Sequence, residues 1–396
     1  MKKSIIAALA ATMLSGAAYA QDGSIKVGVL LGFTGPIESL TPPMAASAEL
    51  ALKEVSDSHA LLDGKTIEAV RADSTCVDSA AATAAAERLV TSDNVAAIMG
   101  ADCSGVTVAV TNNVAVPNGL VMISPSATSP ALTTIDDKGN FFRVVPSDAR
   151  QGQVLSDIIR GKGIDTVAVT YTNNDYGKGL AESFGNAFQA AGGKIAISAA
   201  HEDGKADYSA EVAALAAAGA NDLVIFGYVD QGGKGIMQTA LDTGAFDSFF
   251  GSDGMVGDSL IEALGDGAEG LTTTLPGGES EGGAMFRQLA EAAGLQATGP
   301  FIPEAYDSAA IIALAIQAAG SADRSAIQAK VMDVVNAPGE KIMPGELDKA
   351  LKILAGGGDI DYVGATNVEF NEVGETNGSY KEQVIKDGKY QLVKIH

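Results

Sequence analysis

The chain has 396 residues, of which 46% are hydrophobic and 5% aromatic, and it contains no tryptophan. This composition is typical of a packed globular protein and excludes a disordered one. A formal net charge of −23 argues against nucleic acid or an anionic membrane surface as a partner. Because the length exceeds what one hydrophobic core usually serves, we expect two domains.

The first twenty residues have the pattern of a secretory signal peptide. Lys2 and Lys3 give a positive start, residues 5–14 are apolar, and Ala18-Tyr19-Ala20 forms a small-residue cleavage site. The apolar run is too short to span a membrane. We therefore expect cleavage after Ala20 and an exported, soluble protein of the periplasm.

Apolar strands alternate with helical segments over most of the chain. The strands are near-continuous apolar runs, which a parallel sheet covered on both faces requires. This alternation predicts βαβ units. Because a second series of such units follows the first, the sequence predicts two doubly wound lobes. The expected strands of the first series are 24–33, 65–73, 95–101 and 119–125, and those of the second are 166–172, 194–200, 222–228, 249–254 and 270–276.

The last 120 or so residues differ from this rhythm. Four helices are expected there, and after them two strand-like segments, the second of which contains an Asp387-Gly388 hairpin turn. Few new strands are available to receive these helices, so we expect them to cover a sheet that is already formed. The expected helices are 284–294, 304–319, 323–335 and 345–355.

Two cysteines, Cys76 and Cys103, each follow a predicted strand. In an oxidising compartment a disulfide is the expected state of such a pair. Closing a loop of this size contributes roughly 3–4 kcal/mol in the chain-entropy model. The chain holds only three histidines, too few to complete a zinc site, and we expect neither a metal nor a cofactor.

Polar residues gather just past the predicted strands, where open α/β sheets bind their ligands. They are rich in hydroxyls and hold few charges, which favours a small polar molecule bound by neutral hydrogen bonds and one or two carboxylates. No histidine stands near a strand-end serine, and a G-x-S-x-G elbow is absent, so we do not expect an enzyme. The segments concerned are 33–36, 101–104, 124–129, 173–176, 228–230 and 252–254.

Five segments in this order resemble the type I periplasmic solute-binding proteins of ABC transporters, specifically the leucine/isoleucine/valine-binding branch. They are "VGVLLGFTGP", "ADSTC" with "MGADCSG", "VMISPSATSPALT", "NNDYGKGLAESF" and "FGSDGMVGDSL". The resemblance covers essentially the whole mature chain and implies two βαβ lobes joined by a three-strand hinge. The expected lobes are residues 21–146 plus 277–368 (lobe I) and residues 147–276 plus 369–396 (lobe II).

The resemblance also implies how a ligand's carboxylate is bound. The matching positions are Ser104, Ser126 and Thr128, whose hydroxyls and backbone N–H groups would stabilise an anion without a buried counter-charge. A purely structural role is the alternative for Ser104 and Thr128, because both residue types commonly cap helices.

The second lobe supplies the remaining contacts by the same resemblance. Asp253 matches the acid that pairs with the ligand's ammonium, with a solvated turn aspartate as the alternative. Tyr176 matches a tyrosine that stacks over the ligand, and the alternative is a core tyrosine. Tyr228 matches a further contact, but the alignment can slide and place Val229 or Asp230 there instead.

The sequence departs from the family at Leu40, which stands where an aromatic side-chain contact is expected. Asp230 is a possible second carboxylate that would favour a more polar or cationic ligand. The resemblance implies a monomer that delivers an amino acid to the permease subunits of an ABC importer. The alternatives are a binder of an amide, urea or aromatic acid, and a ligand-sensing module for a receptor.

Overall fold

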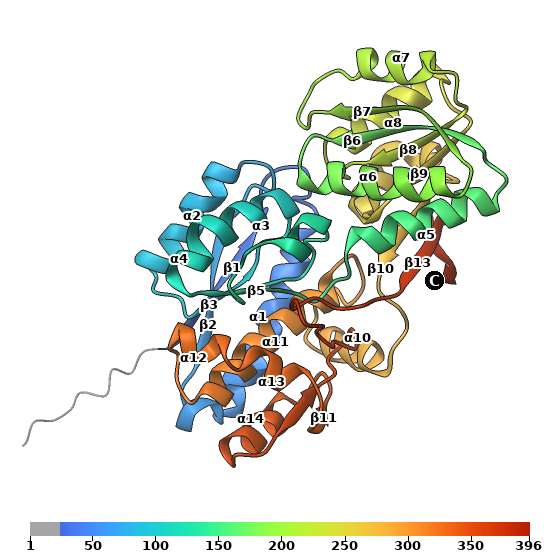
Figure 1. The fold of residues 1–396 in the computed structure, drawn as a ribbon. Coiled ribbons are helices and arrows are strands. Elements are labelled where there is room, and N and C mark those ends of the chain that lie inside the picture. The colour runs from blue at the N-terminus through green and yellow to red at the C-terminus, as the bar shows by residue number, and fades with distance from the viewer. Residues whose placement is uncertain (1–23) are drawn as a thin grey trace, which may run out of the picture.

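The computed structural model describes residues 24–396, so the predicted signal peptide lies outside the described residues. Two α/β lobes lie side by side and are joined by extended segments (Figure 1). The predicted fold class of two doubly wound lobes is confirmed. Within the described part of the chain, no helix combines the length and hydrophobicity that crossing a bilayer would require.

The first lobe is built on a five-stranded parallel sheet in the order β2-β1-β3-β4-β5. Helices α1 and α11 pack together on one side of it, and α2 and α3 pack together on the other (Figure 1). The strands are β1 (Ile25–Leu31), β2 (Ile67–Asp73), β3 (Ala97–Gly100), β4 (Val121–Ser124) and β5 (Phe141–Arg143).

The second lobe repeats this order in strands β7-β6-β8-β9-β10 and adds a C-terminal hairpin, β13-β14, beside β10. Asp387 and Gly388 both have positive φ, 54° and 67°, which a two-residue hairpin turn of this kind requires. The predicted hairpin is thus confirmed. The strands are β6 (Thr166–Thr172), β7 (Lys194–His201), β8 (Asp222–Phe226), β9 (Ser248–Gly251), β10 (Thr272–Pro276), β13 (Tyr380–Lys386) and β14 (Lys389–Ile395).

The helices follow the predicted alternation, with one correction near the C-terminus. The expected helix 323–335 is wrong as a single element, because it divides into α12 and α13. The Arg324 guanidinium attaches α12 to the backbone carbonyls of Val90 and Val95, whereas α13 contacts strand β12. The principal helices are α1 (Thr41–Ser58), α2 (Ser79–Thr91), α3 (Ser104–Val110), α4 (Val116–Asn118), α5 (Asp148–Gly161), α6 (Asp175–Ala190), α7 (Ser209–Ala217), α8 (Gly232–Thr243), α9 (Asp258–Leu264), α10 (Glu281–Ala292), α11 (Ile302–Ala319), α12 (Arg324–Gln328), α13 (Val331–Val335) and α14 (Leu347–Ala355).

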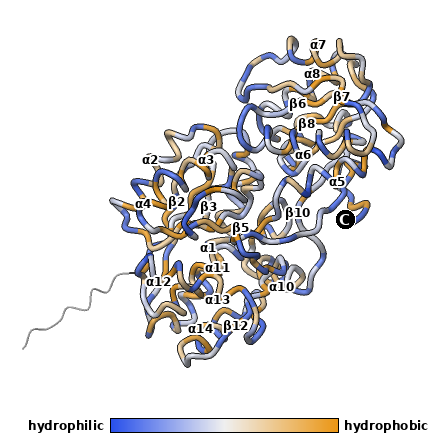
Figure 2. The backbone as a smooth tube through the Cα atoms, viewed as in Figure 1, coloured by the Kyte–Doolittle hydropathy of each residue, from blue (hydrophilic) through white to orange (hydrophobic). Residues whose placement is uncertain are grey.

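A small parallel sheet lies beside these C-terminal helices, and it contains only the start of the first expected strand-like segment, 361–371, whose remainder does not form a strand. It pairs β11 (Glu340–Ile342) with β12 (Ile360–Tyr362), and both strands contact α14. Hydrophobic residues run through the interior of both lobes, while hydrophilic ones are frequent in the connections (Figure 2). Helix α11 is buried over most of its length, because it lies between the first sheet and the helices α1, α13 and α14.

The chain passes between the two large sheets three times. The first passage is 144–147, between β5 and α5, and the second is 277–280, between β10 and α10. The third is 363–379, between β12 and β13. The exact lobe boundaries given above stay predictions.

Candidate ligand-binding site

A cavity lies between the lobes, where the carboxyl ends of strands from both sheets face each other. Its walls come from both sheets and from the start of α11, and it measures about 30 Å³. Ligand pockets usually measure roughly 300–1,000 Å³, so the lobes must part to admit a solute. The lining residues are Ile37, Leu40, Met44, Asp102, Cys103, Ser104, Ser126, Tyr176, Tyr228, Asp253, Gly254 and Phe301.

A disulfide and a buried acid connect the loops on the first-lobe side of the cavity. Cys76 and Cys103 are bonded, with Cα atoms 5.1 Å apart, which confirms the predicted disulfide. Asp102, which the sequence analysis did not single out as a ligand contact, holds three loops together through its carboxylate. The donors are Gly32 N at 2.6 Å, Ser74 Oγ at 2.9 Å and Cys103 N at 2.9 Å.

Two of the three predicted carboxylate-binding residues line this side of the cavity. Ser104 Oγ accepts a hydrogen bond from Ser129 N at 3.1 Å, and Ser126 Oγ donates to Asp102 O at 3.0 Å. Thr128 is fully buried but does not line the cavity. Its hydroxyl lies beside Asp148, although it has no hydrogen-bond partner of ordinary geometry within residues 24–396.

The second-lobe side carries a stacked pair of tyrosines. The rings of Tyr176 and Tyr228 lie 5.3 Å apart and are inclined by 20°. Tyr176 OH makes a hydrogen bond of 2.6 Å with Ser252 Oγ and donates to Asp253 Oδ1 at 3.3 Å. Of the three positions that the alignment left open, Tyr228 lines the cavity, whereas Val229 and Asp230 do not.

Asp253 is the acid of the cavity and is only 4% exposed. Gln151 Nε2 donates to Asp253 Oδ1 at 2.7 Å and is itself held by Thr274. Burial raises the pKa of Asp253 to about 6, although the hydrogen bonds from Gln151 and Tyr176 oppose the shift. An ammonium group beside Asp253 would favour its charged form.

A second buried carboxyl group, Asp148, lies one turn before Gln151 on α5 and interacts electrostatically with Asp253. Burial raises the pKa of Asp148 well above its ordinary value, and the charge of Asp253 raises it further. Neither oxygen of Asp148 has a hydrogen-bond partner within residues 24–396. The nearby Thr128 hydroxyl opposes the shift, and so does the charge of Arg143, although the hydrogen bonds of Arg143 itself go to Glu375, Thr133 and backbone carbonyls. Asp253 is thus the group that makes the second-lobe side suit a cation.

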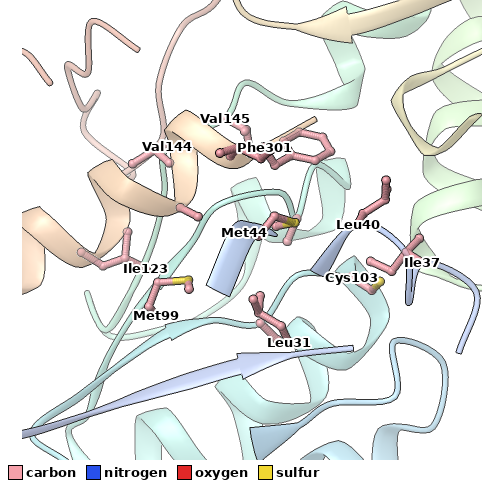
Figure 3. Packing of buried hydrophobic residues seen from close by; sticks show 14 of the residues in the cluster. Leu31, Ile37, Leu40, Met44, Met99, Cys103, Ile123, Val144, Val145 and Phe301 are labelled. Atoms are coloured by element: carbon pink, nitrogen blue, oxygen red, sulfur yellow. The ribbon is translucent and has the colours of Figure 1, made fainter. Parts of the chain in front are cut away.

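The remaining wall is apolar and contains the aromatic side chain that the sequence analysis did not find. Ile37, Leu40, Met44 and Phe301 gather beyond the end of the first sheet (Figure 3). Phe301 stands directly before α11 in a left-handed conformation with φ of 59°, a strained state for a bulky residue. No motif marked Phe301, because it lies far along the chain from every predicted strand end.

Comparisons with known proteins agree with this geometry. The family described as "Periplasmic binding protein" matches residues 24–342. The chain belongs to the periplasmic binding protein family. The leucine-, isoleucine-, valine-, threonine- and alanine-binding protein of Pseudomonas aeruginosa is 30% identical over 324 residues, which are 81% of this chain and 84% of the relative. Proteins of this family bind solutes, in agreement with the prediction that the chain is not an enzyme.

Solved structures of periplasmic binding proteins share the fold. A leucine binding protein from Thermotoga maritima superposes with a TM-score of 0.78 at 23% identity, covering 94% of this chain and 98% of that one. A solute binding protein from R. palustris in complex with benzoate superposes with a TM-score of 0.74 at 17% identity, covering 94% and 96%. At these identities the likeness shows the fold alone.

In this periplasmic binding protein a cluster of hydrogen bonds around Asp230, which we call the latch, joins the two lobes. Ser39 N donates to Asp230 Oδ2 at 2.9 Å, and Ser259 Oγ donates to Asp230 Oδ1 at 2.7 Å. Asp230 N also donates to Pro36 O at 3.1 Å. Both carboxylate oxygens of Asp230 are therefore engaged outside the cavity, which leaves the possible ligand contact of the sequence analysis without geometric support.

Proposed function

We propose that this periplasmic binding protein binds an aliphatic α-amino acid between its lobes and delivers it to the permease subunits of an ABC importer. In this proposal the ligand's ammonium faces Asp253, and its carboxylate faces the hydroxyls of Ser104 and Ser126. Export behind a signal peptide cleaved after Ala20, and a monomeric state, belong to the same proposal. The name of the Pseudomonas aeruginosa relative, which includes four such amino acids together with threonine, supports it.

The observation that carries the proposal is the division of one cavity into three chemical parts. Hydroxyls lie on the first-lobe side, a buried acid lies on the second-lobe side, and a wall of Ile37, Leu40, Met44 and Phe301 lies between the lobes. An α-amino acid with an apolar side chain offers a matching carboxylate, ammonium and hydrocarbon group. The tyrosine pair would cover the ligand from the second-lobe side once the latch closes.

Aromatic acids are the competing ligand class, since structures of similar fold are complexes with benzoate and 4-hydroxybenzoate. These anions have no ammonium to face Asp253. Enclosing them would bring a carboxylate close to Asp253, and two like charges in a buried site cost free energy. The buried acids therefore favour the amino acid.

Isothermal titration calorimetry with matched solutes tests the proposal. Leucine, valine and alanine contain all three groups, whereas leucinamide lacks the carboxylate and 4-methylpentanoate lacks the ammonium. We expect at least one of the three amino acids to bind saturably, and the two leucine analogues to bind at least about 30-fold more weakly than leucine, because each leaves one buried group unpaired. Benzoate or 4-methylpentanoate binding as tightly as the best amino acid would contradict the proposal.

A further inference from the structure

A second and larger cavity lies at the hinge, and the start of α11 lines it as well as the interlobe cavity. It measures about 470 Å³, and all three passages between the lobes contribute to its wall. Phe301 lines the interlobe cavity and Glu304, one turn later, lines the hinge cavity. The residues of the passages and of α10 and α11 that matter below are Gly277, Arg287, Glu304, Thr376, Asn377 and Lys381.

Glu304 is the unusual feature of the hinge cavity, because it is a carboxylate that is only 7% exposed and has one unpaired oxygen. Its Oε2 atom is buried without a hydrogen-bond partner within residues 24–396. Burial raises the pKa of Glu304 to about 7, and its own backbone N–H and then the charge of Lys381 oppose the shift. A buried charge without a partner is costly, so such groups are usually met by a cation or by hydrogen-bond donors.

Lys381 faces the same space but does not close an ion pair with Glu304. No salt bridge of 4.0 Å or less joins the two among the ion pairs of the described chain. The Lys381 ammonium and the Glu304 carboxylate instead both lie near Gly277, whose φ is 111°. A Cβ atom there would lie 3.5 Å from Lys381 Nζ and 3.8 Å from Glu304 Oε1. The absence of a side chain at Gly277 keeps open the space between an ammonium and a carboxylate.

The other charged residues of the hinge cavity are exposed at its rim, where water screens them. They are Glu279, Glu281 and Arg287. Thr376 and Asn377 add neutral hydrogen-bonding groups to the wall. No cluster of three or more metal-binding side chains occurs in residues 24–396, so a metal ion does not account for Glu304.

We propose that the hinge cavity is a second solute site, which binds a small zwitterion with its ammonium at Glu304 and its anionic group at Lys381. Neither Glu304 nor Lys381 lines the interlobe cavity, so the two sites are independent in their residues. A compound with both charges satisfies Glu304 and Lys381 at once, whereas a simple amine would be repelled by Lys381 and a simple anion by Glu304.

β-Alanine, a small zwitterion, is a suitable probe in a protein whose interlobe site has been weakened by Asp253→Asn. We expect calorimetry to show saturable binding of β-alanine to this variant. Adding Glu304→Gln should weaken that binding at least tenfold, since the ammonium then loses its charged partner. Adding Glu291→Gln, which removes an exposed carboxylate of α10 outside the cavity, should leave it unchanged.

Lys381→Gln provides a second test that does not disturb a buried residue, and it should also weaken β-alanine binding at least tenfold. Circular dichroism would verify that each variant is folded. Absence of saturable binding to the folded Asp253→Asn protein would overturn the proposal. So would binding that survives both Glu304→Gln and Lys381→Gln. Because Asp253 is already replaced, these results do not depend on whether the interlobe site binds amino acids.

Discussion

Asp253→Asn is expected to weaken ligand binding and to stabilise the ligand-free protein, because the same buried charge has opposite effects on the two. Asparagine has nearly the same shape, and its oxygen can still accept the hydrogen bond from Gln151. In the complex it leaves the ligand's ammonium without a counter-charge. Removing one partner of a buried charge pair costs about 2–5 kcal/mol, so the dissociation constant should rise at least about 30-fold.

The effect on stability follows from the raised pKa of Asp253. Burial shifts it from 3.8 to about 6, and one pKa unit corresponds to about 1.4 kcal/mol, so the shift amounts to about 3 kcal/mol. The pKa of Asp253 is higher in the folded protein than in the unfolded one. Its contribution to the free energy of unfolding is therefore fully present below pH 4 and is lost as the pH rises through 6. Asparagine does not ionise, and the variant should therefore be more stable than the wild type at pH 8 by up to about 3 kcal/mol.

Calorimetric titration and urea unfolding at pH 4 and pH 8 would measure the two effects. The stability difference between variant and wild type should be large at pH 8 and small at pH 4. Asp258→Asn, at an exposed position of α9, is the matched control and should change neither quantity. An Asp253→Asn protein that binds as tightly as the wild type, or that is less stable at pH 8, would refute this reasoning.

Three further variants test other parts of the site. Ser104→Ala should weaken leucine binding about tenfold in calorimetry but leave leucinamide binding unchanged. Equal losses of affinity for both compounds would argue against a carboxylate contact. Asp230→Ala removes the latch, so stopped-flow measurements should show faster leucine dissociation. An unchanged dissociation rate would mean that the latch has no role in closure. Replacing Cys76 and Cys103 by serine should lower the free energy of unfolding by about 3–4 kcal/mol in urea, and a loss below 1 kcal/mol would contradict the chain-entropy reasoning.

Local patterns were enough to predict the parts of the fold that depend on short stretches of chain. Continuous apolar runs predict buried parallel strands because both faces of such a sheet are covered. The Asp387-Gly388 turn was predictable because its positive φ angles favour those residue types. The division of 323–335 into α12 and α13 was not, since it follows from contacts with Val90, Val95 and strand β12 that lie far away in the chain.

The sequence by itself determined that hydroxyls and acids stand at strand ends, and parallel topology brings such ends together. It therefore indicated the strand-end segments that contain Ser104, Ser126, Tyr176, Tyr228 and Asp253, which line one cavity, and also Thr128, which does not. The resemblance to a known family suggested which of them faces which end of the ligand.

Only the tertiary structure decided what lies opposite these residues. It placed Phe301 in the apolar wall, Asp148 behind Asp253, and Asp230 in a latch rather than at the ligand. It also brought Glu304 beside Lys381 at the hinge. The physical reason is that these contacts join segments separated by scores of residues, and their distances depend on how two lobes pack and close, which no local pattern of residue types encodes.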